Sequence, residues 1–109
     1  MPERPEKQIQ NDILRAFGTL PQLRIWRANV GVARIDGRIV RFGVPGQADL
    51  TGILPDGRRL EIEVKSATGR QTPDQQAFGR MIERFNGVYI LARCPDDIRR
   101  RLEAAGIEL

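Results

Sequence analysis

The sequence predicts an α/β fold in which helices flank a central mixed β-sheet. Three observations support this prediction. Helical and strand patterns follow one another in the order helix, strand, hairpin, long hairpin, helix, strand, helix. The long hairpin, residues 49–65, has one apolar face suited to a core and one face that carries charged residues. The apolar run of residues 88–92 follows a helix, which is typical of a buried strand parallel to its neighbour.

Length and composition indicate one domain, residues 1–109, and exclude several kinds of catalyst. The 109 residues, of which 40% are hydrophobic and 29% charged, are ordinary for a single globular domain. The chain has no His and one Cys, Cys94, which excludes an internal disulfide, a His-based metal site and a Ser-His-Asp triad. Any chemistry must therefore use carboxylates, Lys and a hard metal that prefers oxygen ligands.

Charge and hydropathy bear on partners and location. Residues 1–5 are polar without a signal-peptide core, and no apolar run is long enough to span a bilayer, so we expect a cytoplasmic protein with no membrane partner. The net charge of +4 suits a polyanion such as DNA, and it equally suits solubility alone. The basic residues are all Arg except Lys7 and Lys65, so a Lys two positions after Glu63 is notable, although codon bias would also favour Arg.

The hairpin of residues 49–65 is predicted from its turn. Pro55-Asp56-Gly57 has Pro where a type I turn needs φ of about −65° and Gly where φ must be positive, which favours a three-residue loop. Counting outward from this loop gives the pairs Ile53–Arg59, Thr51–Glu61 and Asp49–Glu63. A two-residue loop would mix apolar and charged residues on each face, so we reject that register.

This register separates two kinds of side chain. The apolar face carries Leu50, Gly52, Leu54, Leu60, Ile62 and Val64. The other face carries Asp49, Thr51, Glu61, Glu63 and Lys65. Opposed side chains have Cβ atoms about 4.5–5.5 Å apart, so Asp49 and Glu63 can share one small divalent cation. Lys65 points to the same face and can reach a bound phosphate or water.

A first helix is predicted for residues 6–17, with Ile9, Ile13 and Phe17 on its apolar face. Glu6 projects from the same face, one turn before Ile9. A carboxylate on an apolar stripe indicates a functional partner, and a favourable interaction with the helix dipole is the competing explanation.

A second helix is predicted to start at Thr72-Pro73, with Thr72 as the N-cap, and to end at Phe85. Gln75 stands where it completes a capping box, and it also lies on the stripe that we expect to be buried. The expected buried residues are Phe78, Met81, Ile82 and Phe85. Gln75 can serve both the cap and an active site. A short basic helix is predicted for residues 96–105.

Between the first helix and the long hairpin, residues 23–30 are predicted to form a strand in which Trp26 belongs to the core rather than to a platform for a nucleobase. Residues 32–42 are predicted to form a hairpin around Asp36-Gly37. This hairpin carries Arg34, Arg38 and Arg41. These arginines suggest a ribbon that contacts phosphates, or a charged edge that prevents aggregation. The glycines of residues 43–46 allow either a close approach of DNA or a tight turn.

Together these motifs resemble a known family. Asp49 followed by Glu63-Val64-Lys65 resembles the D…(D/E)xK signature of the PD-(D/E)XK nuclease superfamily. Residues 43–50 (GVPGQADL), with residues 27–31 (RANVG) upstream and Pro73-Asp74-Gln75 downstream, resemble the virus-type replication-repair nuclease domain, VRR-NUC. The likeness extends from Glu6 to about Ala92.

The resemblance implies a restriction-endonuclease-like fold and a DNA endonuclease that depends on Mg²⁺ or Mn²⁺. Asp49 and Glu63 would bind the metal, and the carbonyl of Val64 would be a further ligand. Glu6 would complete the site directly or through water, with Glu3 as the alternative. The other implied catalytic residues are Lys65, which would hold the attacking water or stabilise charge on the phosphate, and Gln75, which would orient a ligand. The residues expected to contact DNA are Arg27, Asn29, Arg34, Arg38, Arg41 and Gln47.

The resemblance also bears on assembly. Stand-alone proteins similar to VRR-NUC domains are associated with homodimers that resolve four-way DNA junctions, whereas versions fused to larger repair proteins act on flaps. We therefore expect a homodimer and a branched DNA substrate. The alternatives are a flap or nicking nuclease, a DNA-binding module without catalysis, and a subunit of a replication-repair complex.

Overall fold

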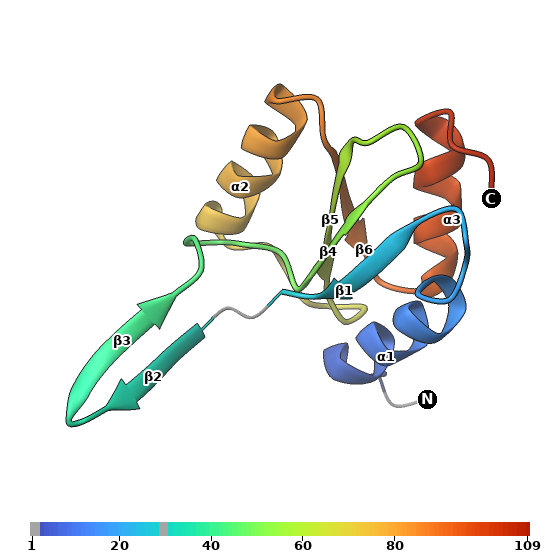
Figure 1. The fold of residues 1–109 in the computed structure, drawn as a ribbon. Coiled ribbons are helices and arrows are strands. Elements are labelled where there is room, and N and C mark those ends of the chain that lie inside the picture. The colour runs from blue at the N-terminus through green and yellow to red at the C-terminus, as the bar shows by residue number, and fades with distance from the viewer. Residues whose placement is uncertain (1–2, 29–30) are drawn as a thin grey trace.

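The structure is a computed structural model that describes residues 3–28 and 31–109. The described residues form three helices and six strands (Figure 1). The helices are α1 (Glu6–Phe17), α2 (Pro73–Arg84) and α3 (Pro95–Ala104). The strands are β1 (Arg24–Arg27), β2 (Gly31–Ile35), β3 (Arg38–Phe42), β4 (Leu50–Ile53), β5 (Arg59–Val64) and β6 (Val88–Ala92). The order of elements is the predicted one.

A four-stranded mixed sheet forms the centre of the molecule. Its strand order is β1-β4-β5-β6, in which β5 and β6 are parallel and the other neighbours are antiparallel. The predicted parallel pairing of β6 is therefore confirmed. β2 and β3 form a separate two-stranded sheet that projects away from the body (Figure 1). Asp36 and Gly37 have φ of 51° and 75° at its turn, as the predicted Asp-Gly hairpin requires.

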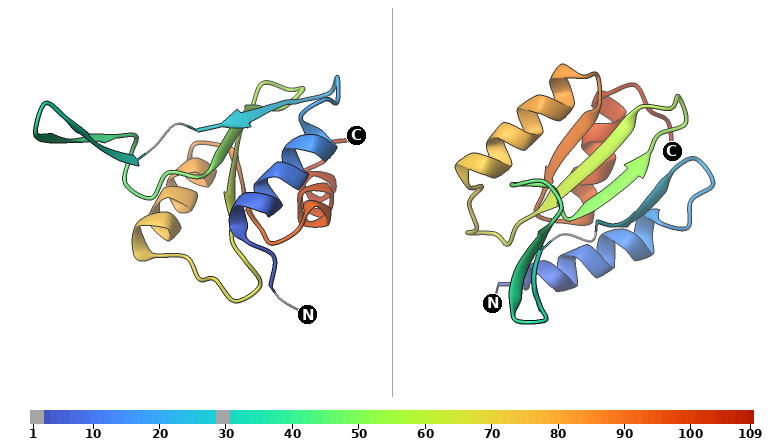
Figure 2. Two further views of the ribbon diagram at one scale, coloured as in Figure 1. Left: turned by 90° about the horizontal axis from the view of Figure 1, so that it is seen from below. Right: turned by 60° about the vertical axis from the view of Figure 1, so that its left-hand side comes forward.

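Helices cover the two faces of the sheet unequally. α1 and α3 pack together on one face, and α2 lies on the other (Figure 2). The main core lies between the sheet and the α1–α3 layer, and it includes Ile13, Leu50, Ile62 and Ile98. A smaller cluster lies under α2 and consists of Ala48, Phe78, Ile82 and Tyr89. None of the helices in the described residues is long and apolar enough to cross a membrane.

The long hairpin has the predicted register. Thr51 pairs with Glu61, and Ile53 pairs with Arg59. The amide of Leu54 donates to the carbonyl of Arg58, and Gly57 has φ of 90°, which closes the three-residue loop. The apolar face is fully buried against α1 and α3, as expected. The charged face is also covered in part, because α2 and β6 bury Glu61 and Glu63, which the sequence did not indicate.

The buried stripe of α2 differs from the prediction. Met81 and Phe85 are 38% and 76% exposed, so their expected burial is wrong. The stripe instead includes Phe78, Gly79 and Ile82. A Cβ atom at Gly79 would lie 2.7 Å from Cε1 of Tyr89, so the helix packs on that ring through the one residue without a side chain. This contact rotates the buried stripe away from Met81.

Trp26 also differs from the prediction. It is 49% exposed, so it is not a core residue. β1 is an edge strand, and α2 contacts β5 and β6 rather than β1 and β4. On the sheet face that carries α2, the part formed by β1 is therefore open to solvent. β1 is also shorter than the predicted strand of residues 23–30, and Asn29 and Val30 lie outside the described residues.

We predict that Gly52→Ala destabilises the fold. A Cβ atom at Gly52 would lie 2.1 Å from the carbonyl oxygen of Arg24, so β1 would have to move away from β4. Overpacking of this kind costs about 1–3 kcal/mol, which urea unfolding would measure. Ile53→Ala is the matched control, because Ile53 is exposed on the same strand and its truncation should cost less than about 1 kcal/mol. A Gly52→Ala protein as stable as the wild type would contradict this packing of β1 on β4.

Candidate active site

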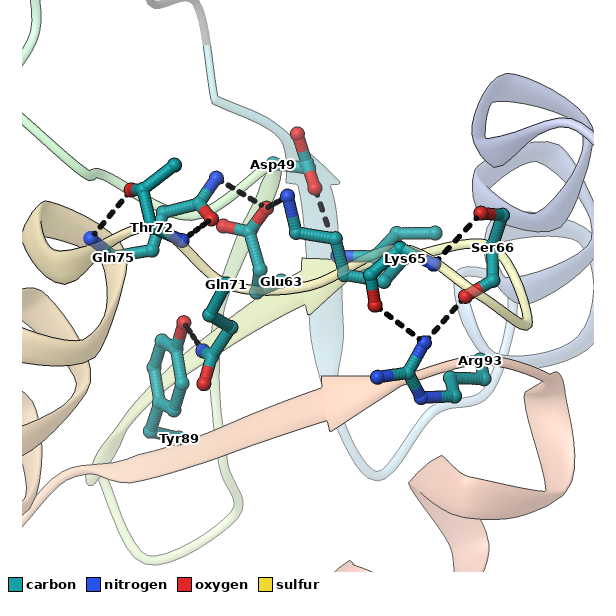
Figure 3. A network of polar contacts seen from close by, with 11 residues as sticks. Asp49, Glu63, Lys65, Ser66, Gln71, Thr72, Gln75, Tyr89 and Arg93 are labelled. Atoms are coloured by element: carbon teal, nitrogen blue, oxygen red, sulfur yellow. Dashed lines mark hydrogen bonds and ion pairs between the residues drawn. The ribbon is translucent and has the colours of Figure 1, made fainter.

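Asp49 and Glu63 meet at one end of the β4–β5 hairpin. Asp49 directly precedes β4, and continuing the observed register by one residue beyond the Leu50–Ile62 pair places it opposite Glu63. The amide of Val64 donates to Oδ2 of Asp49 over 2.8 Å (Figure 3). The Asp49 side chain thus adds one hydrogen bond between the two strands where their backbone pairing ends. The predicted juxtaposition of these two carboxylates is therefore present. The Val64 side chain is buried, so only its backbone can contribute to this site.

The carboxylate of Glu63 is almost completely removed from water, with 2% of the residue exposed. Its Oε1 accepts a hydrogen bond from Nε2 of Gln75 over 3.1 Å. Its Oε2 has no hydrogen-bond partner among the described residues. Burial and, next, the negative charge of Asp49 together raise the pKa of Glu63 from its ordinary value of 4.5 to about 8, while Lys65 opposes the shift. The positive charge near this carboxylate is therefore too weak to offset its burial.

Lys65 is the cation nearest to this pair. Its Nζ lies 3.9 Å from Oε1 of Glu63, which is an ion-pair distance rather than a hydrogen bond. The Lys65 side chain is only 11% exposed. Its backbone amide donates to the carbonyl of Ala92 over 3.0 Å, which ties the end of β5 to β6. The ammonium therefore stands on a fixed backbone with donors free for a further ligand.

Gln75 forms the predicted cap and also contacts Glu63. Its backbone amide donates to Oγ1 of Thr72, and its Oε1 accepts from the amide of Thr72 over 2.8 Å, which completes the capping box. The remaining end of its amide, Nε2, donates to Glu63. The same side chain thus caps α2 and orients the buried carboxylate of β5 (Figure 3).

Glu6 acts on the charge of Glu63, whereas Glu3, the alternative third carboxylate, is bound elsewhere. Glu6 is the first residue of α1, and its charge is among those that raise the pKa of Glu63. Glu3 instead accepts hydrogen bonds from the amide and the hydroxyl of Thr68, and these bonds lower its pKa. The structure therefore favours Glu6 over Glu3 as the third acidic group.

Arg93 holds the loop that joins Lys65 to α2, and no pattern in the sequence indicated this contact. Its Nη1 donates to the carbonyls of Ser66 and Gly69, with 2.8 Å for the second bond (Figure 3). The hydroxyl of Ser66 accepts from the amide of Gly69. Arg93 directly follows β6, so the parallel pairing of β5 and β6 brings it beside the residues that follow Lys65. Only knowledge of that pairing could have identified it.

Tyr89 and Gln71 form another contact that the sequence did not reveal. Nε2 of Gln71 donates to the hydroxyl of Tyr89 over 2.9 Å, next to the ring that packs on α2. Burial raises the pKa of Tyr89, and the charge of Glu63 adds to this effect. Tyr89 therefore remains a neutral phenol beneath the site. Its bond from Gln71 holds the segment that leads into α2.

Glu61 is the second buried carboxylate of β5, but it has a strong partner. It is fully buried, and Arg59 binds its Oε1 through two nitrogens, each at 2.8 Å. Burial raises the pKa of Glu61, and the charge of Arg59 opposes that shift. Oε2 of Glu61 is also without a hydrogen-bond partner in the part of the chain that the structure describes, but the charge of Glu61 is paired closely with Arg59, whereas the cation near Glu63 is the more distant Lys65.

A cleft of about 470 Å³ lies beside the carboxylates, between the base of the β2–β3 hairpin and the start of α2. Asp49, Gln75 and Arg41 contribute to its walls. The loop of residues 43–47 forms another wall. A Cβ atom at Gly46 would lie 2.1 Å from the carbonyl oxygen of Asp74, so this glycine allows the loop to approach α2.

The residues expected to contact DNA fall into separate places. Gln47 lines the cleft, and its Oε1 accepts from the amide of Val44 over 3.0 Å, so it also closes the loop. Arg41 reaches the cleft, and Arg34 and Arg38 lie farther out on the hairpin. Arg27 donates to Oδ1 of Asn11 on α1, which is the opposite side of the sheet from the carboxylates. Asn29 lies outside the described residues.

The donor set fits a hard divalent cation only in part. Asp49 and Glu63 offer carboxylate oxygens, and the orphaned Oε2 of Glu63 is an acceptor in need of a partner. This is the chemistry that Mg²⁺ and Mn²⁺ prefer. In residues 3–28 and 31–109, however, no three acidic, His or Cys side chains are close enough to form a complete metal-binding group. Glu6 would have to approach, or backbone and water oxygens would have to complete the ligand set.

No protein-family model, curated protein or solved structure matches this chain.

We predict that Glu63→Gln changes the pH dependence of stability in metal-free buffer. Because the folded pKa of Glu63 is raised from 4.5 to about 8, the folded state retains a proton that the unfolded state loses. Wild-type stability should therefore decrease as pH rises through that interval, relative to the variant. Denaturant unfolding across this range would give the difference. Parallel curves for the two proteins would contradict the buried, raised pKa of Glu63.

Proposed function

We propose that this chain is a metal-dependent endonuclease of the PD-(D/E)XK type that hydrolyses DNA phosphodiester bonds. The observation that carries the proposal is the environment of Glu63. A buried carboxylate with an orphaned oxygen lies beside a second carboxylate, with an ammonium 3.9 Å away. Such an arrangement is costly for stability alone and becomes favourable when a divalent cation binds. The mixed sheet with helices on both faces is compatible with this proposal.

Asp49 and Glu63 would hold the cation, with the Val64 carbonyl and Glu6 as further ligands. A bound Mg²⁺ or Mn²⁺ supplies Lewis acidity at the phosphoryl oxygen and lowers the pKa of its water. Asp49 is oriented for this task by the amide of Val64, and Glu63 by the side chain of Gln75. Burial keeps the carboxylate of Glu63 from rotating into solvent, while Asp49 is only partly buried and is held by its bond from Val64.

Lys65 would act on the phosphate or the attacking water. Its ammonium is a compact charge with three donors, and it stands on the same face as the carboxylates. From this position it can stabilise the negative charge that develops on the phosphoryl oxygens. Arg93 would keep the loop behind Lys65 in place through Ser66 and Gly69.

The β2–β3 hairpin would contact the DNA backbone. Arg34, Arg38 and Arg41 form no ion pair with other described residues, so their charges are available to phosphates. The arginines of α3 differ, because Arg99 and Arg100 pair with Asp96 and Asp97. The hairpin and the adjacent cleft are therefore the best candidates for the DNA-binding surface.

Substitution of Lys65 tests the chemistry. We expect Lys65→Arg to lose most cleavage while it retains DNA binding, because a planar guanidinium does not fit a place shaped for an ammonium. Cleavage by the wild type should require Mg²⁺ or Mn²⁺ and stop in excess chelator, and Asp49→Asn should abolish it at equal folding stability. Cleavage is followed on labelled DNA, and binding by anisotropy. Full wild-type activity in chelator would refute the proposal.

We further propose that the chain acts as a homodimer on branched DNA, with four-way junctions as the preferred substrate. One site cuts one phosphodiester, and two-fold pairing presents two sites to two strands. The exposed apolar residues of the hairpin support an association, because an isolated two-stranded sheet is only marginally stable in water. These residues are Val32, Ile35, Ile39, Val40 and Phe42.

Solution mass and a panel of substrates test this second proposal. A dimer that cleaves four-way junctions faster than flaps or plain duplexes is the expected result. All substrates should be compared at one salt concentration, because phosphate contacts depend strongly on salt. A monomer that cuts flaps or duplexes and spares junctions would refute the assembly and leave the nuclease chemistry intact.

A further inference from the structure

The sheet face that carries the carboxylates is only half covered. Cross-strand partners share a face, so Trp26, Thr51, Glu61 and Tyr89 all lie on the side of α2. Tyr89 and Glu61 are buried at 8% and 0% exposure, while Trp26 is 49% exposed. Thus α2 and β6 bury one half of this face and leave the half formed by β1 and β4 open to solvent.

Trp26 lies close to the candidate catalytic pair on this open half. It pairs with Thr51, and Asp49 precedes Thr51 by two residues. A cross-strand step is about 5 Å, and two residues along a strand span about 6.8 Å, so the separation is about 8 Å. A nucleotide whose phosphate lies at the carboxylates could therefore place its own base, or that of its neighbour, against the indole.

One cation without a carboxylate partner in the described part of the chain, Arg24, lies next to Trp26 on this face. Arg24 lies two residues before it on the same face, and its guanidinium donates only to the carbonyls of Leu20 and Leu23 among the described residues. Its charge is therefore not cancelled by a carboxylate. Arg59 lies on the same cross-strand row as Arg24, through Ile53, but its charge is paired with Glu61. The surface thus offers an exposed aromatic ring with the guanidinium of Arg24 on one side and the carboxylate pair on the other.

We propose that Trp26 stacks on an unpaired nucleobase of the DNA strand that is cut. The inference rests on the proposed nuclease function and adds a substrate requirement to it. An exposed aromatic ring on an open sheet, with a cation beside it, is an arrangement by which proteins bind single-stranded nucleic acid. Bases within a duplex are stacked on each other and present no free face. The substrate must therefore supply a base that is unpaired at a branch, a flap or a single strand near the scissile phosphate.

Fluorescence tests this inference directly, because Trp26 is the sole Trp in the chain. An oligothymidylate and a duplex of equal length are titrated into the full chain in chelator, with anisotropy of labelled DNA as an independent measure of binding. We expect the single strand to quench the emission in a saturable way with the same Kd that anisotropy gives. The duplex should bind with little quenching.

Substitutions supply the second measurement. Trp26→Leu should weaken binding of the oligothymidylate about tenfold or more, and Trp26→Phe should restore most of the affinity, because base stacking needs a ring. Phe85→Leu is the matched control, since Phe85 is 76% exposed on another part of the surface and its loss should leave binding unchanged. Cleavage of branched DNA should follow the same order.

Three results would overturn the inference. Anisotropy that reports tight binding without a change in emission, and with equal affinity for Trp26→Leu, would remove Trp26 from the DNA surface and leave the nuclease proposal standing. Emission of the DNA-free protein that changes on dilution would show that a second copy covers Trp26. A failure to bind any DNA by either measurement, together with no cleavage, would remove the proposed function as well.

Discussion

The buried carboxylate of Glu63 is the constraint on which the rest of this structure depends. A charged group without a strong partner is expensive to bury, and here its pKa rises to about 8. The fold keeps it in place from three directions. The register of β4 sets Asp49 beside it, Gln75 of α2 binds one of its oxygens, and Lys65 follows it on the same strand. The cap of α2 and the candidate site are thus one structural unit.

β5 shows how a strand can serve a core and a site at once. Its even-numbered residues Leu60, Ile62 and Val64 are fully buried against α1 and α3, and its odd-numbered residues carry the carboxylates. A slip of one residue would exchange these two sets, so the packing of the core also fixes the position of the carboxylates. Glu61 and Glu63 share a face and differ in their partners. Arg59 neutralises Glu61 at 2.8 Å, whereas Glu63 has only the ammonium of Lys65 at 3.9 Å.

The local features of this fold were predictable from the sequence. The features that depend on which helix covers which part of the sheet were not. The turn chemistry of Pro55-Asp56-Gly57 determined the register of the hairpin, and the capping box determined the start of α2. The sequence could not reveal how far α2 extends over the sheet. For this reason Phe85 and Trp26 were expected in the core and are exposed. Arg93 was missed for a related reason. Its contact follows from the pairing of β5 with β6, and the residues next to Arg93 in the sequence do not reveal that pairing.

The central claim is that Asp49 and Glu63 together hold a divalent cation, and calorimetry tests it most directly. Mn²⁺ is titrated into the metal-free protein at neutral pH, in two buffers that differ in ionisation enthalpy. Because Glu63 with a pKa of about 8 is largely protonated there, binding should release about one proton, and Asp49→Asn and Glu63→Gln should each lose most of the affinity. Wild-type Mn²⁺ affinity in both variants, or the absence of Mn²⁺ binding to the wild type, would contradict the account.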